Sequence, residues 1–295
     1  MVHDLLYKGS LSDLRVGFSY CVTTELVNEA VLRHNCDPLS AHLLGRAVSA
    51  GVLLSATLSG QERVNVRWKY DGRVRTVLVD AGADGTTRGF VSPVELLSQS
   101  DTLDDLFGDA AELSVIRSAG GRVVNSGVTH SILRDVVNDL TYFLAISDQV
   151  ETAMTVLIGF NQNEERPVRL CRGLMLQAMP DTDMEVFEQL RTALDGDEAR
   201  ELLAHDTEPD GLLENVIHAL FQGRAHGSLE YEAVPSPRFQ CTCSREKMVQ
   251  VLRALPQSDR ADILEKKEKV KINCQFCNER YVMSIDECMQ VWGCS

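Results

Sequence analysis

The clearest alternation of apolar and polar residues runs from Val64 to Tyr70, where every second residue is apolar. The pair Asp71-Gly72 follows, and then a second strand-like run up to Val79. Because an Asp-Gly pair readily adopts the positive φ angles of a type I′ turn, we predict a β-hairpin here. Similar runs of strand-forming residues predict further strands at residues 15–22, 88–91, 112–118, 122–128, 152–160 and 168–178.

Apolar residues at helical spacing predict helices over residues 24–33, 38–59 and 131–146. Thr23 or Thr24 is a suitable cap for the first helix, and Pro38 is a suitable first residue for the second. The second helix is apolar enough to lie at the centre of the core. Strands and helices do not alternate regularly along this part of the chain. We therefore predict an α+β domain with a largely antiparallel sheet over residues 1–178.

Residues 179–234 differ from the preceding part of the chain in their charge. They contain fourteen Asp and Glu against three Arg. Short helical patterns occupy residues 184–194, 198–205 and 212–221, and each has a narrow apolar stripe. Two interpretations remain open for this helical linker. It either packs on the first domain, or stays close to unfolding and exposes its apolar stripes when its support is removed.

A Pro235-Ser236-Pro237 segment marks the end of the linker, because proline fixes a non-helical backbone. The last region, residues 235–295, holds six of the nine cysteines of the chain. We therefore predict three parts: a core domain at 1–178, an acidic helical linker at 179–234 and a small cysteine-rich domain at 235–295.

Four of the cysteines form two close pairs, Cys241-Thr-Cys243 and Cys274-Gln-Phe-Cys277, which thirty residues separate. Four thiolates arranged in two pairs are the ligands that tetrahedral Zn²⁺ prefers. We predict that all four bind one zinc ion. The zinc either only stabilises a domain too small to fold alone or belongs to a site with thiol chemistry. Thioredoxin-like exchange at Cys274 and Cys277 is disfavoured, because the βαβ context is missing.

The residues around the two pairs predict the elements that bring them together. Ser244 can cap a helix over residues 245–255, and Ser258 can cap a second helix over residues 259–267. Strand-like residues at 270–273 lead into the second pair, and those at 281–283 lead away from it.

The remaining cysteines have weaker signals. Cys288 follows Ser284 in a short helical pattern, and Cys294 is the penultimate residue. Each is either a spare thiol or a resolving partner during oxidation. We interpret Cys21, Cys36 and Cys171 as small buried hydrophobic residues.

Composition excludes several other functions. The net charge of −14 disfavours a nucleic-acid surface, and the lysines within residues 266–271 alternate with glutamates, as on a solvated face. The sequence has neither a phosphate-binding loop nor a dinucleotide-binding glycine motif, and no acid–base pair is singled out, so we predict no enzyme and no catalytic residue. It lacks a long apolar run and an apolar block at residues 1–9, so we predict a cytoplasmic protein without a membrane partner.

The cysteine motifs resemble those of the 33 kDa chaperonin family, the redox-regulated bacterial heat-shock holdases. The resemblance is strongest for CTCSRE at residues 241–246 and CQFCNERY at residues 274–281. Supporting stretches are TTEL at 23–26, VDAGADG at 79–85, DLTYF at 139–143 and SDQ at 147–149. The resemblance extends over essentially the whole chain. Cys288 and Cys294 do not belong to the family pattern.

The resemblance implies an ATP-independent chaperone whose reduced, zinc-bound form is inactive. Oxidation would join Cys274 to Cys277 and then Cys241 to Cys243, and the zinc would leave. The cysteine-rich domain and the linker would then lose their fold and expose an apolar surface that binds unfolding client proteins. The family also implies that the active form is a homodimer. A constitutive interaction protein with a purely structural zinc site is the alternative.

Overall fold

The computed structural model describes residues 3–97, 102–130, 133–205, 209–221 and 229–293. The chain forms two compact units, Met1–Phe239 and Gln240–Ser295. The linker residues that the structure describes belong to the first unit. The boundary between a core domain at 1–178 and a linker at 179–234 rests on the charge pattern and stays a prediction.

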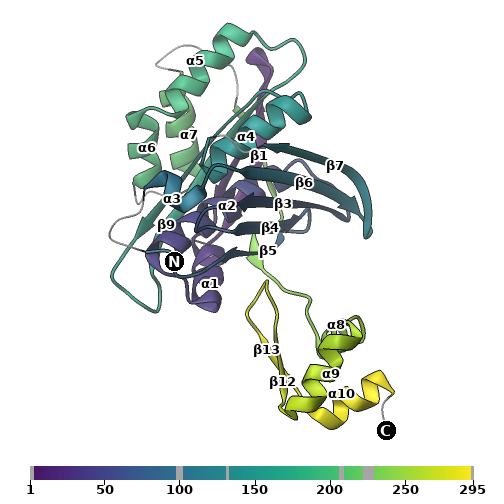
Figure 1. The fold of residues 1–295 in the computed structure, drawn as a ribbon. Coiled ribbons are helices and arrows are strands. Elements are labelled where there is room, and N and C mark those ends of the chain that lie inside the picture. Colours follow the sequence, from purple (N-terminus) through teal and green to yellow (C-terminus); the bar gives the residue numbers. More distant parts are fainter. Residues whose placement is uncertain (1–2, 98–101, 131–132, 206–208, 222–228, 294–295) are drawn as a thin grey trace. The chain divides into compact units, whose positions relative to one another are not determined.

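The first unit contains two sheets (Figure 1). The first sheet, sheet A, has five described strands in the order β10-β1-β2-β9-β8, and all its neighbours are antiparallel. Its strands are β1 (Leu5–Leu11), β2 (Val16–Val22), β8 (Thr152–Phe160), β9 (Val168–Ala178) and β10 (Leu229–Val234). Strands β8 and β9 have the predicted bounds, whereas β1 and β10 were not predicted.

The second sheet, sheet B, has the described strand order β11-β5-β4-β3-β6-β7. Only the short pair between β11 and β5 is parallel. The strands are β3 (Glu62–Tyr70), β4 (Thr76–Gly82), β5 (Thr86–Ser92), β6 (Ala111–Ala119), β7 (Arg122–His130) and β11 (Arg238–Phe239). The predicted α+β class with largely antiparallel pairing is confirmed.

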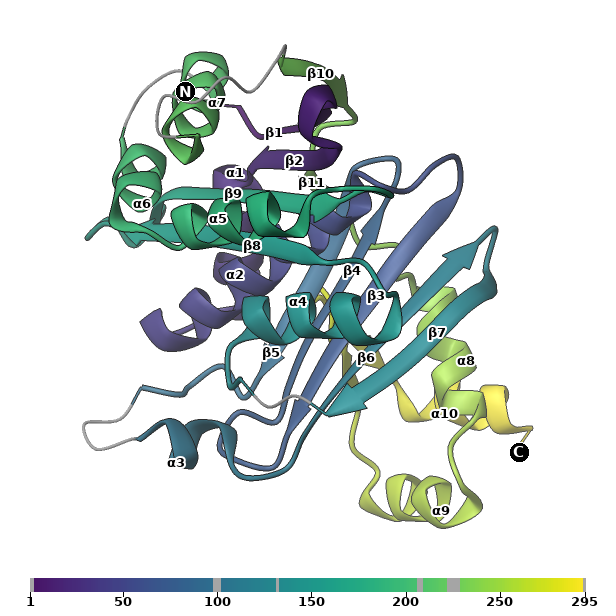
Figure 2. The same cartoon turned by 90° about the horizontal axis from the view of Figure 1, so that it is seen from above.

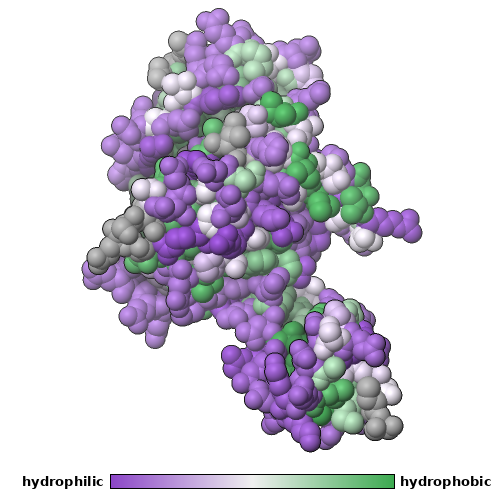
Figure 3. All heavy atoms as spheres, viewed as in Figure 1, coloured by the Kyte–Doolittle hydropathy of each residue, from purple (hydrophilic) through white to green (hydrophobic). Residues whose placement is uncertain are grey.

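One face of sheet A is covered by the three linker helices (Figure 2). They are α5 (Met184–Leu194), α6 (Asp197–Ala204) and α7 (Pro209–Leu220). Their apolar stripes pack against one set of alternating strand residues, such as Phe18 and Tyr20 of β2 and Leu174 of β9. The linker is therefore a packed layer in this structure, and the surface in view is mostly hydrophilic, with small separate hydrophobic groups (Figure 3).

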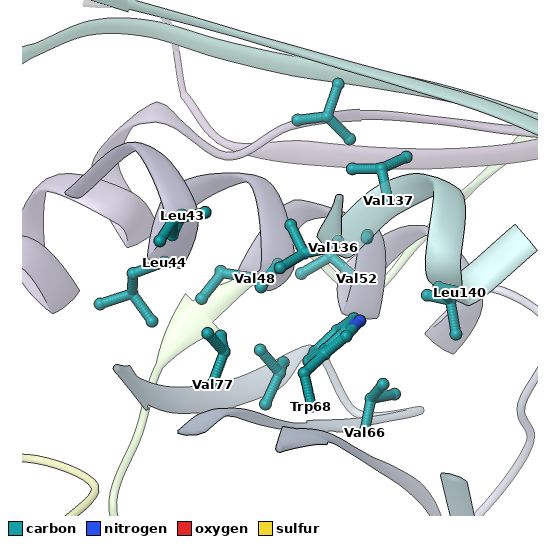
Figure 4. Packing of buried hydrophobic residues seen from close by; sticks show 14 of the residues in the cluster. Leu43, Leu44, Val48, Val52, Val66, Trp68, Val77, Val136, Val137 and Leu140 are labelled. Carbon is teal, nitrogen blue, oxygen red and sulfur yellow. The ribbon is translucent and has the colours of Figure 1, made fainter. Parts of the chain in front are cut away.

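The other face of sheet A packs on α2 (Pro38–Ser55), which also contacts strands of sheet B. Figure 4 shows Val48 and Val52 of α2 near Trp68 of β3, together with Leu140 of α4 (Val136–Ser147). Trp68 is completely buried. The predicted central core helix is confirmed, although it ends at Ser55 and not at residue 59.

The predicted hairpin from β3 to β4 is present, but its turn type and the start of the helix predicted over residues 131–146 were wrong. Neither Asp71 nor Gly72 has a positive φ angle, so the hairpin from β3 to β4 does not use a type I′ turn. Instead, Gly72 N–H donates to Phe107 O, in the short helix α3 (Leu103–Phe107). The helix predicted over 131–146 begins at Val136, because Asp135 accepts hydrogen bonds at its first turn; residues 131–132 lie outside the described part.

Helix α1 (Thr24–His34) is capped by a residue that the sequence did not indicate. Thr23 occupies the cap position, but its hydroxyl contacts Ser49 at 2.6 Å and makes no cap hydrogen bond. The carboxylate of Asp4 accepts instead from the N–H groups of Glu25 and Leu26, at 2.9 and 2.7 Å. The start of α1 is therefore tied to the beginning of the chain.

The second unit contains a two-stranded sheet and three described helices. The strands are β12 (Val270–Asn273) and β13 (Arg280–Met283), and the helices are α8 (Arg245–Arg253), α9 (Gln257–Lys266) and α10 (Ile285–Trp292). Its buried core consists of Leu252, Met283 and Cys288. Helix α9 starts at Gln257 behind Pro256, so the prediction that Ser258 caps it was wrong. None of the described helices of the chain has the length and hydropathy needed to cross a bilayer.

Replacing Asp4 with Asn is expected to change the pH dependence of stability. Burial raises the pKa of Asp4 to about 7. Between pH 4 and pH 7 the folded chain therefore keeps a proton that the unfolded chain releases, and stability is lost as the pH rises through this range. In Asp4→Asn this loss should be smaller, by on the order of 2–4 kcal/mol.

Urea unfolding followed by circular dichroism at pH 4 to 7.5 measures this difference. Asp13→Asn is the matched control, because Asp13 is an exposed carboxylate near the same end of the chain. An identical pH dependence in Asp4→Asn and in the unmodified chain would contradict the assignment.

Candidate metal centre

The second cysteine pair lies in the tight turn between β12 and β13. The strands pair up to Asn273 and Arg280, which places the turn directly at the end of the hairpin. Cys274 N–H donates to Glu279 O at 2.9 Å, and Asn278 N–H donates to Cys274 O at 2.8 Å. Asn278 adopts the left-handed region, with φ of 58°. This backbone turns the two side chains of the Cys-x-x-Cys segment toward the same point.

The first pair lies in the irregular segment that precedes α8. Ser244 caps this helix, as predicted, because its hydroxyl accepts from Lys247 N–H at 3.4 Å. Thr242 lies between the two cysteines in sequence. The Lys247 ammonium donates to Thr242 O and lies 3.2 Å from Thr242 Oγ1. The start of α8 therefore holds the Cys-x-Cys segment in place.

The structure brings all four predicted cysteines together. Their Sγ atoms lie within 4.8 Å of one another. The Sγ atoms of Cys241 and Cys274 are 3.7 Å apart, and those of Cys243 and Cys277 are 3.3 Å apart. Four sulfurs around one tetrahedral Zn²⁺ with bonds of about 2.3 Å would be about 3.8 Å apart. The sulfur atoms therefore have the spacing of a metal site. None of the described cysteines forms a disulfide.

The electrostatics of the cluster also fit a cation. Burial raises the pKa of the Cys277 thiol, and the nearby sulfurs of Cys243, Cys274 and Cys241 raise it further. Burial likewise raises the pKa of Cys274. These two thiols therefore resist becoming thiolates unless a positive charge compensates them. A divalent metal supplies that charge, and an all-cysteine donor set favours a soft or borderline ion such as Zn²⁺.

Hydrogen bonds to the sulfurs differ between the two pairs. Cys274 Sγ accepts from the backbone N–H groups of Phe276 and Cys277, and Cys277 Sγ accepts from that of Glu279. Cys243 Sγ accepts from the hydroxyl of Tyr281 on β13, at 3.1 Å. The hydrogen bond to Cys243 raises the pKa of Tyr281, so the phenol keeps its proton. The role of Tyr281 was not predicted, and only its position four residues after Cys277 could have indicated it.

The other cysteines lie apart from the cluster. Cys288 is completely buried in the core of the second unit, and Cys294 lies outside the described residues. Cys21 and Cys171 are completely buried in the first unit, and Cys36 is half-buried. Burial raises the pKa of Cys36 and of Cys171 to about 11. The prediction that Cys21 and Cys171 are small buried residues is confirmed. Cys36, for which the same was predicted, is only half-buried and packs against the core of the first unit.

The fold and the site define a class of protein: an α+β unit joined to a small unit with a four-cysteine centre that could hold a metal ion. The Hsp33 protein family model matches residues 4–284. The chain therefore belongs to this family.

Proteins of similar sequence carry the name 33 kDa chaperonin. One from Synechococcus sp. (strain JA-2-3B'a(2-13)) is 31% identical over 293 residues, which covers 96% of this chain and 88% of that protein. One from Bacillus subtilis (strain 168) is 29% identical over 290 residues and covers 96% of both. These names are those of chaperonins and not of enzymes, and they support a chaperone function.

The fold is also that of a solved structure. The crystal structure of the 33 kDa chaperonin (heat shock protein 33 homolog) from Thermotoga maritima matches 99% of this chain and 98% of that chain. The TM-score is 0.82 at 24% sequence identity. This similarity shows the fold.

Replacing both Cys274 and Cys277 with Ser is expected to abolish tight metal binding. The two substitutions remove half of the sulfur ligands, so the loss of affinity should exceed the roughly 10–100-fold cost of losing a hydrogen-bond partner of a ligand. The metal content per chain after gel filtration, measured by inductively coupled plasma mass spectrometry, checks this. Cys288→Ala in the same unit is the control and should retain its metal; one tightly bound metal in the double variant would refute the assignment.

Proposed function

We propose that this chain is an oxidation-activated, ATP-independent holdase chaperone. The observation that carries the proposal is the cluster of four cysteine sulfurs within 4.8 Å, in a chain of the Hsp33 family. In the reduced form one Zn²⁺ would be bound by Cys241, Cys243, Cys274 and Cys277, and this form would be inactive. The zinc would keep the sulfurs as thiolates, the form that oxidants attack.

The proposed switch is the oxidation of the four thiolates to two disulfides. Each hydrogen peroxide molecule accepts two electrons from one pair of thiolates and, with two protons, becomes two water molecules. Cys274 would join Cys277 and Cys241 would join Cys243, so two peroxide molecules oxidise one site. Disulfide sulfurs are poor ligands, so the site would then lose its metal. Thiol reductants reverse both bonds by exchange.

Loss of the metal should unfold the second unit, because its apolar core is small. Among the described residues, Leu252, Met283 and Cys288 form the buried cluster, and partly buried apolar side chains such as Ile272 and Trp292 pack against it. A structural zinc site contributes on the order of 10–16 kcal/mol, and this binding energy is largely folding energy. Apolar burial in so small a core would not replace it.

The linker helices supply the surface that the active form would expose. Phe187, Leu190 and Leu194 of α5 are buried, as are Leu213 and Val216 of α7. They cover apolar strand residues of sheet A, so release of the helices would expose both surfaces at once. The helices are short and carry an excess of acidic residues, which makes them unstable once separated from the sheet.

We include three further points in the proposal on the basis of the family. The partners are unfolding or oxidatively damaged client proteins, which exposed apolar surface binds without sequence specificity. The active form is a homodimer, and neither nucleic acid nor a membrane is a partner. The protein acts in the cytoplasm, where thiol reductants return it to the inactive form.

Aggregation of a heat-labile client protein, followed by light scattering, tests the proposal. The chain is added either reduced and zinc-loaded or after treatment with peroxide and mild heat, without ATP. We expect suppression of aggregation only by the oxidised form, together with release of zinc. Equal suppression by both forms, or oxidant-resistant zinc, would instead favour a constitutive interaction protein with a structural zinc site.

Replacing Phe187 with Ala is expected to activate the chain partly without oxidant. Phe187 is completely buried between α5 and sheet A, so its truncation should weaken the linker packing by about 3–5 kcal/mol. The reduced, zinc-loaded variant should then suppress client aggregation and bind a hydrophobic dye. Met184→Ala on the same helix is the control, because Met184 is 43% exposed. A destabilised Phe187→Ala variant that remains inactive would refute this role of the linker.

A further inference from the structure

We infer that the Tyr281 hydroxyl protects Cys243 from oxidation, and so controls the rate at which the first cysteine pair reacts. The inference rests on the proposed function, because it concerns the reactivity of the same four thiolates. Its basis is the hydrogen bond of 3.1 Å from Tyr281 Oη to Cys243 Sγ.

The position of Tyr281 is set by the fold of the second unit. Tyr281 lies on β13 opposite Ile272 of β12, and both side chains pack against the core that contains Leu252. The ring is therefore held by apolar contacts. Its hydroxyl contacts Cys243 of the first cysteine pair, which lies 38 residues earlier in the sequence. Because the hydroxyl is already held in place, the Tyr281 side chain loses no further conformational freedom when the sulfur becomes charged.

Exposure alone would make the first pair, Cys241 and Cys243, the easier target for an oxidant. Cys274 and Cys277 are 8% and 5% exposed, whereas Cys241 and Cys243 are only partly buried. The sulfurs of Cys274 and Cys277 also accept backbone N–H groups of their own turn. Cys243 thus combines greater exposure with a side-chain donor, and this donor can be removed without altering the backbone.

The chemistry explains why one hydrogen bond slows the reaction. The Cys243 thiolate uses a lone pair to attack one oxygen of hydrogen peroxide, the O–O bond breaks, and hydroxide leaves and takes a proton to form water. The sulfenic acid that results is attacked by the Cys241 thiolate; the S–S bond forms and a second hydroxide leaves as water. A hydrogen bond stabilises the negative charge on sulfur and so lowers its nucleophilicity in the first step.

The test is Tyr281→Phe, which removes the hydroxyl and keeps the ring. Zinc release after addition of peroxide, followed with a chromogenic chelator, should be faster by about 2–10-fold, the factor that one net hydrogen bond is worth. Thiol labelling at early times, read by mass spectrometry, should show increased oxidation of Cys243. Tyr231→Phe on β10 of the first unit is the control and should oxidise at the rate of the unmodified chain.

A second measurement separates this role from a structural one. In the Co²⁺-substituted protein, loss of the hydrogen bond raises the energy of the sulfur lone pair, so the sulfur-to-cobalt charge-transfer band should shift to longer wavelength in Tyr281→Phe. An unchanged band together with an unchanged release rate would overturn the inference. Release of zinc from Tyr281→Phe without peroxide would also overturn it, because the hydroxyl would then be needed for the fold.

Both readouts are taken without a client protein. Faster oxidation in Tyr281→Phe with no gain of chaperone activity would support the role of Tyr281 and contradict the holdase proposal. Oxidation-dependent chaperone activity together with an unchanged rate of zinc release in Tyr281→Phe would support the holdase proposal and contradict the role of Tyr281.

Discussion

The second unit depends on one constraint, the crowding of four cysteine sulfurs within 4.8 Å. As thiolates they repel one another, and burial makes the charged form of Cys274 and Cys277 still less favourable. A bound cation would remove this repulsion and join segments that lie more than thirty residues apart. Under the proposed function, the fold of this unit would depend on the oxidation state of its sulfurs, because its apolar core is small. A reaction that consumes the thiolates would then remove the interaction that joins the two segments.

The first unit has a different organisation, because its two helical layers on sheet A are held unequally. Helix α2 lies between the two sheets and contacts strands of both, so it cannot leave without disrupting the main core. Helices α5, α6 and α7 cover the opposite face of sheet A and belong to a separate apolar cluster. Like charges along the linker oppose its compact form. Under the proposed function, the outer layer would therefore be released at a lower free-energy cost than the inner one.

The elements that were predicted correctly are those whose pattern is local and strong. Strands β8, β9 and β12 and helix α5 have the predicted bounds, because strand-forming runs or an apolar stripe extend over their whole length. Strands β1 and β10 were missed, since their residues are mixed in polarity and lie at one side of sheet A, where β10 is the edge strand. Turns and caps failed for another reason: their partners lie elsewhere in the chain. Asp4, and not Thr23, accepts hydrogen bonds from the first N–H groups of α1, and α3 determines the loop after β3.

Patterns of neighbouring residues were enough to predict the α+β class, the central apolar helix and the two cysteine pairs at metal-ligand spacing. Which surfaces and atoms meet followed only from the packing of the folded chain. It placed the linker stripes on sheet A, brought Cys241 and Cys243 to Cys274 and Cys277, and set the Tyr281 hydroxyl on Cys243. Such contacts need positions accurate to a fraction of an ångström between residues far apart in sequence. Local spacing does not fix those positions, because they result from the packing of whole elements against one another.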